Sequence, residues 1–440
     1  MLWRIARWGT MDAATGRWGL VTTNAQASPS IVPALVAGFT ISMVFVAVLS
    51  IVLTVAGPGG LGLSEGEASG WIALVYGLPM IPSLVLTLRY RTPLLLTGNV
   101  FAAIFLASLG DRFAFSELAG ASVVAGAIVL VTTMLGATGR IAGWIPAPIV
   151  QGLIAGAVLP FLVDVFSAID TSEEGIAVEV AVMVGTAVVA YLLGDRLLGR
   201  LVPPVVPAFV AGALVAAITG QLGAFPSLFE LPRFDFDGPT FSWASIAGVT
   251  PVFVALMTVQ SNVPSVIYLR SQGFDPPERL VNLVSGVGTM VGSALGPVAV
   301  SLALPPLLVA AGPSGGERSI RYKAVYVPIA TGLLIALFAG TATEIAALVP
   351  PVLLLTMAGL ALVPALIAAL RAVSAGPLVL GPLFALAIVL SEMSLFGLGS
   401  FFWSLVLGTL VSLVFERDGW RALAERDPAA PLGAGEADPR

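Results

Sequence analysis

Pro93-Leu-Leu-Leu-Thr-Gly-Asn-Val-Phe101 and Pro297-Val-Ala-Val-Ser-Leu-Ala-Leu-Pro-Pro306 are the two stretches that decide the fold of this chain. Each begins with a proline, continues through a few residues that favour extended structure, and passes a small or polar break before the apolar sequence resumes. The segments that contain them, 93–109 and 297–312, are too short and too interrupted for ordinary membrane helices. Irregular backbone inside a membrane is tolerated only where protein or a watery cavity satisfies it. Two such segments at matching places in two halves of a chain indicate the binding site of a transporter.

The composition is typical of a membrane protein. The chain has 440 residues, of which 58% are hydrophobic and 10% charged, and its mean hydropathy is +1.00. A soluble domain of this size could not bury so much apolar surface, so we expect an all-α polytopic membrane protein. The chain contains no cysteine and no histidine, and it has no basic stripe. We therefore expect no enzyme activity, no metal site, no cofactor and no nucleic-acid partner.

Apolar runs of about 20 residues, the length that crosses a bilayer, predict fourteen membrane segments. In the first half these are 31–56, 70–88, 93–109, 117–137, 145–167, 176–194 and 205–222. In the second half they are 245–269, 280–294, 297–312, 321–340, 346–370, 377–395 and 397–415. Seven segments in each half force an inverted relation between the halves, with the interrupted segment third in each. The sequence thus predicts a 7+7 inverted repeat, with short strands in segments 3 and 10 and Thr97 opposite Ser301.

Loop charges predict the orientation in the membrane. If the N-terminus is cytoplasmic, all but two of the 20 basic residues lie on the cytoplasmic side, the exceptions being Arg112 and Arg233. Acidic residues dominate the outer loops, as at Glu65 and Glu173. Because the Lys and Arg content of loops sets topology, we expect a multi-pass protein of the cell (inner) membrane with both termini in the cytoplasm.

The interrupted segments also predict an anion site. Thr97 or Asn99 can cap the half-helix after the first break, and Pro305 and Pro306 suit the first turn of the half-helix after the second. Extended backbone is expected at 94–96 and 298–300, followed in the second case by a turn at Ser301. Both half-helices would point their positive ends and free N–H groups at the middle of the membrane, which favours an anion. The alternative is a pair of kinks in ordinary helices.

The densest polar cluster within any apolar segment is Thr258, Gln260, Ser261 and Asn262 in segment 245–269. Pro264 cannot donate a backbone hydrogen bond to the Gln260 carbonyl, so this acceptor is left beside two amide side chains. Polar groups in lipid normally face the bundle interior or a cavity. The cluster therefore predicts a substrate contact, with hydrogen bonding between helices as the alternative.

Several stretches resemble the benzoate/proton symporter family. They are Asn262-Val-Pro264, Leu269-Arg270, Gly273-Phe274, Pro276-Pro277, Ala311-Gly312-Pro313 leading to Arg321-Tyr322, Ala358-Gly-Leu-Ala-Leu362, and Gly397-Leu-Gly399 followed by Phe402-Trp403. The likeness extends over most of the chain and is strongest after residue 250. It implies the fold shared by nucleobase, sulfate and bicarbonate carriers, in which a core domain moves against a gate domain. Proton coupling is implied by this resemblance alone.

Two departures from the family pattern fall on the expected site. The chain has Leu96-Thr97-Gly98-Asn99 where the family has a Trp-Ser-Thr-Pro-Gly run, and Gly296-Pro-Val-Ala-Val-Ser301 where the family has a histidine. The membrane-embedded acids Asp164, Glu179 and Glu392 lie near the outer ends of their segments, where we expect ordinary interface residues.

The resemblance implies a division of the chain into core and gate. The expected parts are a cytoplasmic N-terminal segment (1–30), a core domain (31–138 and 245–341), a gate domain (139–222 and 342–416), an extracellular connector (223–244) and a cytoplasmic tail (417–440). The tail is rich in Pro, Gly and Ala, and we expect it to be disordered.

These features together predict a secondary active transporter of a small organic anion, with benzoate or another aromatic carboxylate as the leading substrate and with proton symport and alternating access. Half-helix ends would hold the anion, amides would orient it, and phenylalanines would wall its ring. The expected substrate-binding residues are Thr97, Gly98, Asn99, Phe101, Phe253, Gln260, Asn262, Ser301 and Leu302. The alternatives are a nucleobase or inorganic-anion carrier of the same fold, or an anion channel. Membrane lipids surround the chain, and a second copy of it is kept as a candidate partner.

Overall fold

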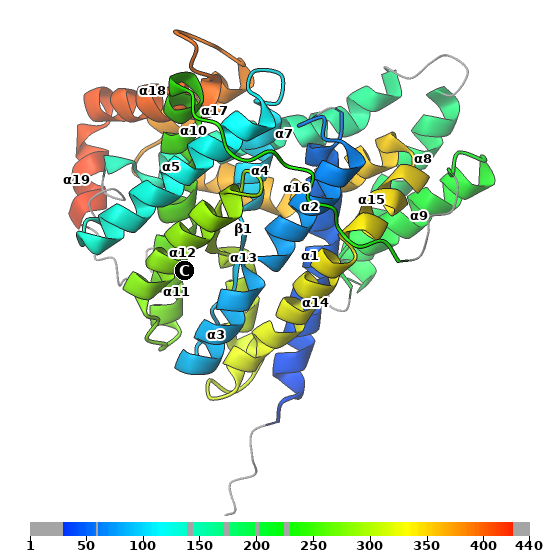
Figure 1. The fold of residues 1–440 in the computed structure, drawn as a ribbon, viewed down its shortest axis with the longest axis horizontal. Coiled ribbons are helices and arrows are strands. Elements are labelled where there is room, and N and C mark those ends of the chain that lie inside the picture. Colours follow the sequence, from blue (N-terminus) through cyan, green and yellow to red (C-terminus); the bar gives the residue numbers. More distant parts are fainter. Residues whose placement is uncertain are drawn as a thin grey trace, which may run out of the picture. The chain divides into compact units, whose positions relative to one another are not determined.

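Helices form nearly all of the part of the chain that the structure describes (Figure 1). The structure is a computed structural model, and it describes residues 30–58, 60–138, 144–170, 177–198, 202–223 and 229–425. Residues 1–30 and 31–440 form two separate units, and the elements named below belong to the second. The expected N-terminal segment up to residue 29 and the tail beyond residue 425 lie outside the described ranges.

The first half of the chain contains nine of the elements. They are α1 (Val32–Ala56), α2 (Glu65–Gly77), α3 (Met80–Tyr90), β1 (Leu96–Gly98), α4 (Val100–Ala107), α5 (Phe115–Met134), α7 (Ala147–Asp170), α8 (Ala177–Leu198) and α9 (Val205–Ile218).

The second half begins with a helix whose middle is π-helical. Its elements are α10 (Trp243–Ala255), the π-helical segment η1 (Leu256–Asn262), α11 (Val263–Ser271), α12 (Glu278–Ser293), β2 (Val300–Leu302), α13 (Leu304–Ala310), the 3-10 turns η2 (Pro313–Gly315) and η3 (Arg321–Val325), α14 (Tyr326–Leu337), α15 (Ala339–Leu348), α16 (Pro351–Ser374), α17 (Leu380–Leu390), α18 (Ser400–Phe415) and α19 (Arg417–Glu425).

The helices agree with the expected class of polytopic membrane protein. Within the described ranges, seven helices are long and apolar enough to cross a membrane, or up to nine if each sharply bent pair is one span. Large apolar side chains remain exposed on these helices, as at Val36 (58%) and Phe39 (52%) on α1. Such an apolar surface suits contact with lipid.

The segment expected at 70–88 is part of one apolar span, Glu65–Tyr90, in which Pro79 lies at the turn between α2 and α3. The structure differs from the expected segments at two places. Residues 339–348, expected at the junction of two segments, form the separate helix α15, bent 74° from the η3–α14 helix. Residues 417–425 are helical rather than disordered, and Gly419 of α19 packs closely on the Pro377 carbonyl.

The two halves of the chain are intertwined. Helix α5 packs on α10 and α12, α7 packs on α16 and α17, and α14 packs on α1 and α2 (Figure 1). A large apolar core extends over most of these helices, while a second core joins α8, α9 and α16 through residues such as Met183, Ala208 and Leu353. Neither half therefore buries its apolar surface by itself.

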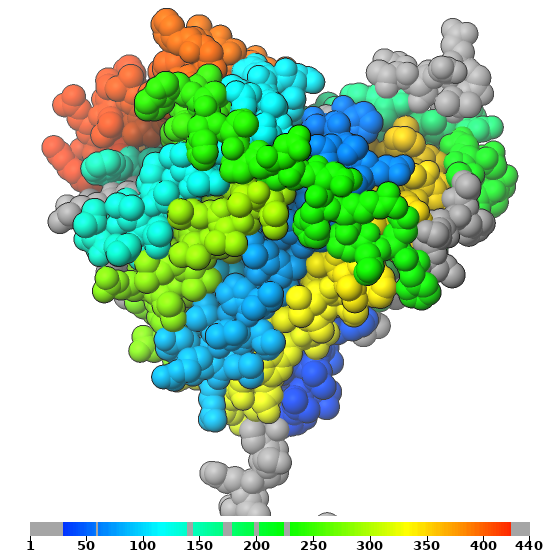
Figure 2. Space-filling model, in the orientation of Figure 1, coloured from blue at the N-terminus to red at the C-terminus, as the bar shows by residue number. Residues whose placement is uncertain are grey.

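The connecting segment 229–242 runs across α15, α2 and α5 and is visible in green on the face shown in Figure 2. Its backbone N–H groups donate to Thr341 Oγ1 from Glu230 (2.9 Å), to Ser69 Oγ from Arg233 (3.1 Å) and to the Ser116 carbonyl from Thr240 (2.9 Å). The backbone of this segment lies close to α2, because a Cβ added at Gly70 would lie 2.3 Å from the Arg233 carbonyl oxygen.

Strands β1 and β2 pair in an antiparallel two-stranded sheet between the half-helices α4 and α13 (Figure 1). The register places Thr97 opposite Ser301 and is completed by the pairs Leu96–Leu302 and Gly98–Val300. The strands lie two residues later than the expected ranges 94–96 and 298–300, and Ser301 is a strand residue rather than a turn residue. The reason is that in this register residues 94 and 298 would face residues 304 and 100, which already belong to helices α13 and α4.

Candidate functional site

Hydroxyl side chains of helix α3 satisfy the outer edge of β1. The Leu96 N–H donates to Ser83 Oγ (2.8 Å), and this hydroxyl lies 3.2 Å from the Leu96 carbonyl oxygen. One turn further along α3, the Leu94 N–H donates to Thr87 Oγ1 (3.2 Å), whose hydroxyl donates to the Leu94 carbonyl (3.1 Å). These bonds replace water, which the unpaired strand edge could not obtain inside a membrane.

Helix α12 satisfies the edge of β2 in the same way. The Val300 N–H donates to Thr289 Oγ1 (2.9 Å), and the Val298 N–H donates to Ser293 Oγ (3.4 Å). The Ser293 hydroxyl returns a bond to the Val298 carbonyl (3.2 Å). As on α3, the two hydroxyl residues are four positions apart, so both lie on the helix face that meets the strand.

The sheet has one polar face and one apolar face. Thr97 and Ser301 are direct cross-strand neighbours, so their side chains lie on the same face. Asn99 follows Thr97 by two positions in extended backbone and shares this face, since its Nδ2 lies 3.2 Å from Ser301 Oγ. Leu96, Gly98, Val300 and Leu302 alternate onto the opposite face.

The π-helical segment η1 brings its own polar residues to the polar face of the sheet. Asn99 Nδ2 lies 3.0 Å from Ser261 Oγ, 3.3 Å from Gln260 Oε1 and 3.4 Å from the Leu256 carbonyl oxygen. A primary amide nitrogen has two N–H groups, so these three acceptors and Ser301 Oγ compete for two bonds. Asn99 thus connects three elements at one point. π-Helical insertions often occur at functional sites.

Asn99 also caps the half-helix α4. Its Oδ1 accepts the N–H groups of Phe101 (3.0 Å) and Ala102 (3.2 Å), which is the usual geometry of an asparagine N-cap. Of the two caps expected from the sequence, Asn99 rather than Thr97 fills the role.

Much of the expected supply of free N–H groups at the two half-helix ends is occupied. Those of Phe101 and Ala102 bond to Asn99, as described above, and the Ala303 N–H donates to the Leu95 carbonyl (3.0 Å). Helix α13 starts with Leu304, Pro305 and Pro306, and a proline has no N–H to offer. The sequence indicates the helix ends correctly, but nearby protein groups occupy most of the donors.

Asn262 is fully buried, with an exposed fraction of 0%, and protein groups engage its whole amide. Its Oδ1 accepts the Leu302 N–H (2.9 Å), and its Nδ2 donates to Asn282 Oδ1 (2.9 Å) and Ser285 Oγ (3.0 Å). Asn262 therefore holds β2 against η1 and α12 in this structure. The site could receive a ligand at this residue only through a rearrangement.

Gln260 and Thr97 are half-buried polar residues of the site that keep unused hydrogen-bonding capacity. Gln260 Oε1 accepts from Ser261 Oγ (2.5 Å) and from Asn99, but its Nε2 has no acceptor within the described ranges. The Thr97 hydroxyl likewise has no hydrogen-bond partner among the described residues. Phe101, also half-buried, lies in the first turn of α4, where its N–H bonds to Asn99.

Three other expected site residues lie away from the polar face. Gly98 packs on α2, where a Cβ would lie 2.6 Å from Val75 Cγ1. Leu302 is buried on the same apolar face. Phe253 is fully buried on α10 and meets Phe105 edge to face, with ring centroids 6.1 Å apart.

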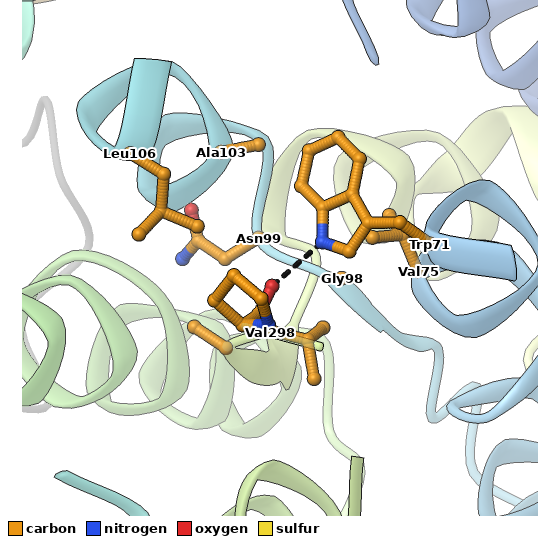
Figure 3. Close-up of a pocket in the computed structure, with 9 residues that line it drawn as sticks. Trp71, Val75, Gly98, Asn99, Ala103, Leu106 and Val298 are labelled. Carbon is orange, nitrogen blue, oxygen red and sulfur yellow. Dashed lines mark hydrogen bonds between the residues drawn. The ribbon is translucent and has the colours of Figure 1, made fainter. Parts of the chain in front are cut away.

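A small cavity borders the site on the α2 side (Figure 3). It lies among Trp71, Val75, Gly98 and Asn99 and has a volume of about 10 Å³, which is room for one water molecule. Trp71 Nε1 donates to the Pro297 carbonyl (2.7 Å) across it, as the dashed line in Figure 3 marks. A ligand the size of an aromatic acid does not fit here without movement of the surrounding elements.

Sequence reasoning missed the residues that support the site. Ser261 belongs to the predicted polar cluster but not to the predicted binding residues, and the prediction includes none of the supporting hydroxyls on α3 and α12. These supporting hydroxyls have a sequence pattern, because in the helix before each interrupted segment two hydroxyl residues lie four positions apart. Asn282 and Ser285 of α12 add a second buried polar layer behind Asn262.

Comparison with known proteins adds evidence on the family. The family model described as benzoate membrane transport protein matches residues 28–414. A benzoate membrane transport protein of Acinetobacter baylyi (strain ATCC 33305 / BD413 / ADP1) is 22% identical over 348 residues, which are 78% of this chain and 85% of the relative. The inner membrane protein YdcO of Escherichia coli (strain K12) is 24% identical over 357 residues, which are 80% of this chain and 88% of that protein.

Two solved structures share the fold. The transmembrane domain of the cyanobacterial bicarbonate transporter BicA matches with a TM-score of 0.51 and 14% identity, over 87% of this chain and 96% of that one. The murine anion transporter Slc26a9 in its inward-facing state matches with a TM-score of 0.55 and 12% identity, over 88% of this chain and 69% of that one. The family model covers most of the sequence, so this chain belongs to the benzoate membrane transport protein family, a family of membrane transporters.

Proposed function

We propose that this protein is a secondary active transporter that carries benzoate or a similar aromatic carboxylate together with a proton. The observation that carries the proposal is the polar face shared by β1, β2 and η1, where Gln260 Nε2 and the Thr97 hydroxyl are left without protein partners within the described ranges. The similarity to the benzoate membrane transport protein of Acinetobacter baylyi supports the choice of benzoate.

Each residue of the site has a proposed role. Gln260 and Thr97 contact the carboxyl group of the substrate, and Phe101 contacts its ring. Asn99 and Ser301 complete the polar surface, while Asn262, Gly98, Leu302 and Phe253 position the strands and the half-helix α4 from behind. This division follows the half-buried state of the first group and the burial of Asn262, Leu302 and Phe253.

The proposed architecture is a fourteen-segment 7+7 inverted repeat. It is supported by the matching use of hydroxyls at the two strand edges. Ser83 and Thr87 bond to residues 96 and 94, just as Thr289 and Ser293 bond to residues 300 and 298. The helix that precedes each break thus serves the strand in the same order, which is what two copies of one ancestral unit would retain.

We propose that α1–α5 and α10–α14 form the core and that α7–α9 and α16–α18 form the gate. The separate apolar core of α8, α9 and α16 supports a gate with its own packing. The small cavity beside Asn99 supports a cycle in which core and gate move apart to admit substrate, which is alternating access. We place the protein in the inner membrane with both termini in the cytoplasm, following the loop charges.

Counterflow uptake of labelled benzoate into proteoliposomes tests the function. Liposomes loaded with unlabelled benzoate should accumulate label above the level of protein-free liposomes, whereas a channel would only equilibrate it. Gln260→Leu should lower the rate at least tenfold, because a buried carboxyl group would lose its amide partner. The matched control is Gln272→Leu, since Gln272 is half-buried at the far end of α11. Equal rates for the two variants would refute the assignment of Gln260.

Solute competition separates benzoate from the other carriers of this fold. Excess bicarbonate, sulfate or uracil should leave benzoate counterflow unchanged. If one of these solutes inhibits benzoate counterflow and itself shows counterflow, that solute and not benzoate is the substrate.

A further inference from the structure

We propose that the site binds the carboxyl group in its neutral, protonated form, so that the transported proton travels on the substrate and not on a protein side chain. The inference rests on the proposed function, because it assumes that the substrate carries a carboxyl group. It identifies the chemical species that the site recognises.

The polar groups at the site are all uncharged. The side chains on the polar face are the amides of Asn99 and Gln260 and the hydroxyls of Thr97, Ser261 and Ser301. Amides and hydroxyls do not ionise in the physiological range, so none of them can supply a positive charge to a carboxylate or take up a proton from water.

The half-helix ends do little to replace a missing cation. Asn99 Oδ1 occupies the N–H groups of Phe101 and Ala102, which would otherwise face an anion. Helix α13 presents two prolines in its first turn. An ionised carboxylate buried here would lose its hydration without a compensating charge, and this is strongly unfavourable.

Charged and titratable residues on the surrounding elements have other partners or lie away from the site. Within their bounds, α1, β1, α4, α10, η1, β2 and α13 contain none. Tyr76 Oη donates to the Phe45 carbonyl (3.0 Å), and Tyr268 Oη donates to the Leu308 carbonyl (3.1 Å). Arg270 pairs with Glu278 (2.9 Å). The remaining ones with described side chains on the packed helices are Glu65 and Glu67 on α2, Arg89 and Tyr90 on α3, Asp164 on α7 and Arg279 on α12, none of which bonds to a site residue. Asp170 is the last residue of α7.

The unused groups of the site match a neutral acid. A protonated carboxyl group has one O–H donor and one carbonyl acceptor. Gln260 Nε2 can donate to that carbonyl, and the Thr97 hydroxyl can accept the O–H, so every new polar group finds a partner. A carboxylate offers acceptors only; Gln260 Nε2 and the Thr97 hydroxyl could both donate to it, but its full charge would stay buried without a compensating cation.

The proton balance of the cycle follows directly. On the side where the site opens, a carboxylate and a proton from water combine to form the O–H bond of the acid. This bond stays intact while the site is closed and breaks on the opposite side, where both ions return to water. One proton moves with each anion and no net charge crosses, so the coupling requires no titrating residue on the protein.

Three ligands of similar shape test the proposal by binding to the purified full-length protein. They are benzoate, which ionises, benzamide, which stays neutral, and benzenesulfonate, which stays anionic. Dissociation constants are measured by tryptophan fluorescence from about pH 5 to about pH 8, above the carboxyl pKa of about 4. Benzoate affinity should fall about tenfold per pH unit as the neutral fraction falls. Benzamide affinity should not change with pH, and benzenesulfonate should not bind.

The possible failures can be told apart. Benzoate affinity that is independent of pH, with benzenesulfonate as a competitor, would show an anion site and overturn the proposal while the proposed function stands. Benzamide affinity that falls in parallel with that of benzoate would place the titrating group on the protein and overturn it as well. If none of the three ligands binds at any pH, the aromatic-acid function fails together with the inference.

Discussion

Asn262 accepts the backbone N–H of Leu302 at 2.9 Å and thereby fastens strand β2 to the π-helical segment η1. The bond joins two parts of one half, while the pairing of Thr97 with Ser301 joins the two halves. The strand edges, the half-helix cap and the π-helix therefore form one continuous hydrogen-bonded unit. A change in any of its members is expected to affect stability as well as transport.

Asn262→Leu should destabilise the protein by roughly 2–5 kcal/mol, because it leaves the Leu302 N–H and Asn282 Oδ1 buried without partners. The measurement is the midpoint of thermal unfolding of the purified protein in detergent. Folded variant protein should still bind benzoate with nearly the wild-type Kd, since Asn262 holds the strand from behind. A weaker Kd with an unchanged midpoint would instead put Asn262 in direct contact with the substrate.

Thr289→Val and Ser83→Ala should each lower stability by about 1–3 kcal/mol, because each leaves a strand N–H of Val300 or Leu96 unsatisfied within the apolar core. Thr40→Val on α1 is the control, since its hydroxyl bonds only to the Val36 carbonyl of its own helix. Unfolding midpoints equal to that of the control would contradict the role given to the two edge hydroxyls.

Gly98→Ala should destabilise the protein by about 1–3 kcal/mol and slow transport. The new methyl group would lie 2.6 Å from Val75 Cγ1 and 2.9 Å from the Val75 carbonyl oxygen, so β1 would have to move away from α2. Gly185→Ala on α8 is the matched control, because nothing lies within 4 Å of its added Cβ. It should raise stability by about 0.4–1 kcal/mol. A Gly98 variant as stable as the control would mean that α2 adapts freely.

Glu416 should contribute stability that depends on pH. Its carboxylate accepts the N–H groups of Val379 (2.5 Å), Leu380 (2.7 Å) and Gly381 (3.0 Å) at the start of α17, and the Ser412 hydroxyl (2.7 Å). Partial burial opposes ionisation, but these hydrogen bonds outweigh it and lower the pKa of Glu416 below its usual value. The stabilisation is therefore complete above the carboxyl pKa of the unfolded chain and is lost as pH falls through the lowered folded pKa.

Glu416→Gln is expected to lower the unfolding midpoint at neutral pH, with a difference from wild type that shrinks as the pH is lowered toward about 3. Unfolding midpoints at a series of pH values provide the check. Glu317→Gln serves as the control, because Glu317 is exposed. A difference that stays constant over this pH range would show that the charge of Glu416 does not stabilise α17.

Much of the fold could be predicted because it depends on local rules. The hydropathy of α1, α5, α7 and α16 indicates apolar helices long enough to cross a membrane, and the structure has them. The additional helix α15 was harder to predict, because it depends on a bend whose cost is offset by contacts elsewhere. One such contact is the bond from the Glu230 N–H to Thr341 Oγ1.

The candidate site could be predicted only in part. Thr97, Asn99, Gln260 and Ser301 were expected together and do lie together. The sequence does not distinguish Gln260, which keeps a free amide nitrogen, from Asn262, whose amide is fully used. Both are amide residues in the same apolar segment, and only their neighbours in space differ.

The sequence by itself determined where the two interrupted segments lie, because each begins with a proline, Pro93 or Pro297, that has no N–H group and is followed by residues that favour extended structure. Tertiary structure alone decided which groups satisfy those breaks. Asn99 finds Ser261 and Ser301 far along the chain, and Val300 finds Thr289 on a neighbouring helix. Hydrogen bonds are short and directional, so a partner is chosen by position in space, and distance along the sequence carries little information about it.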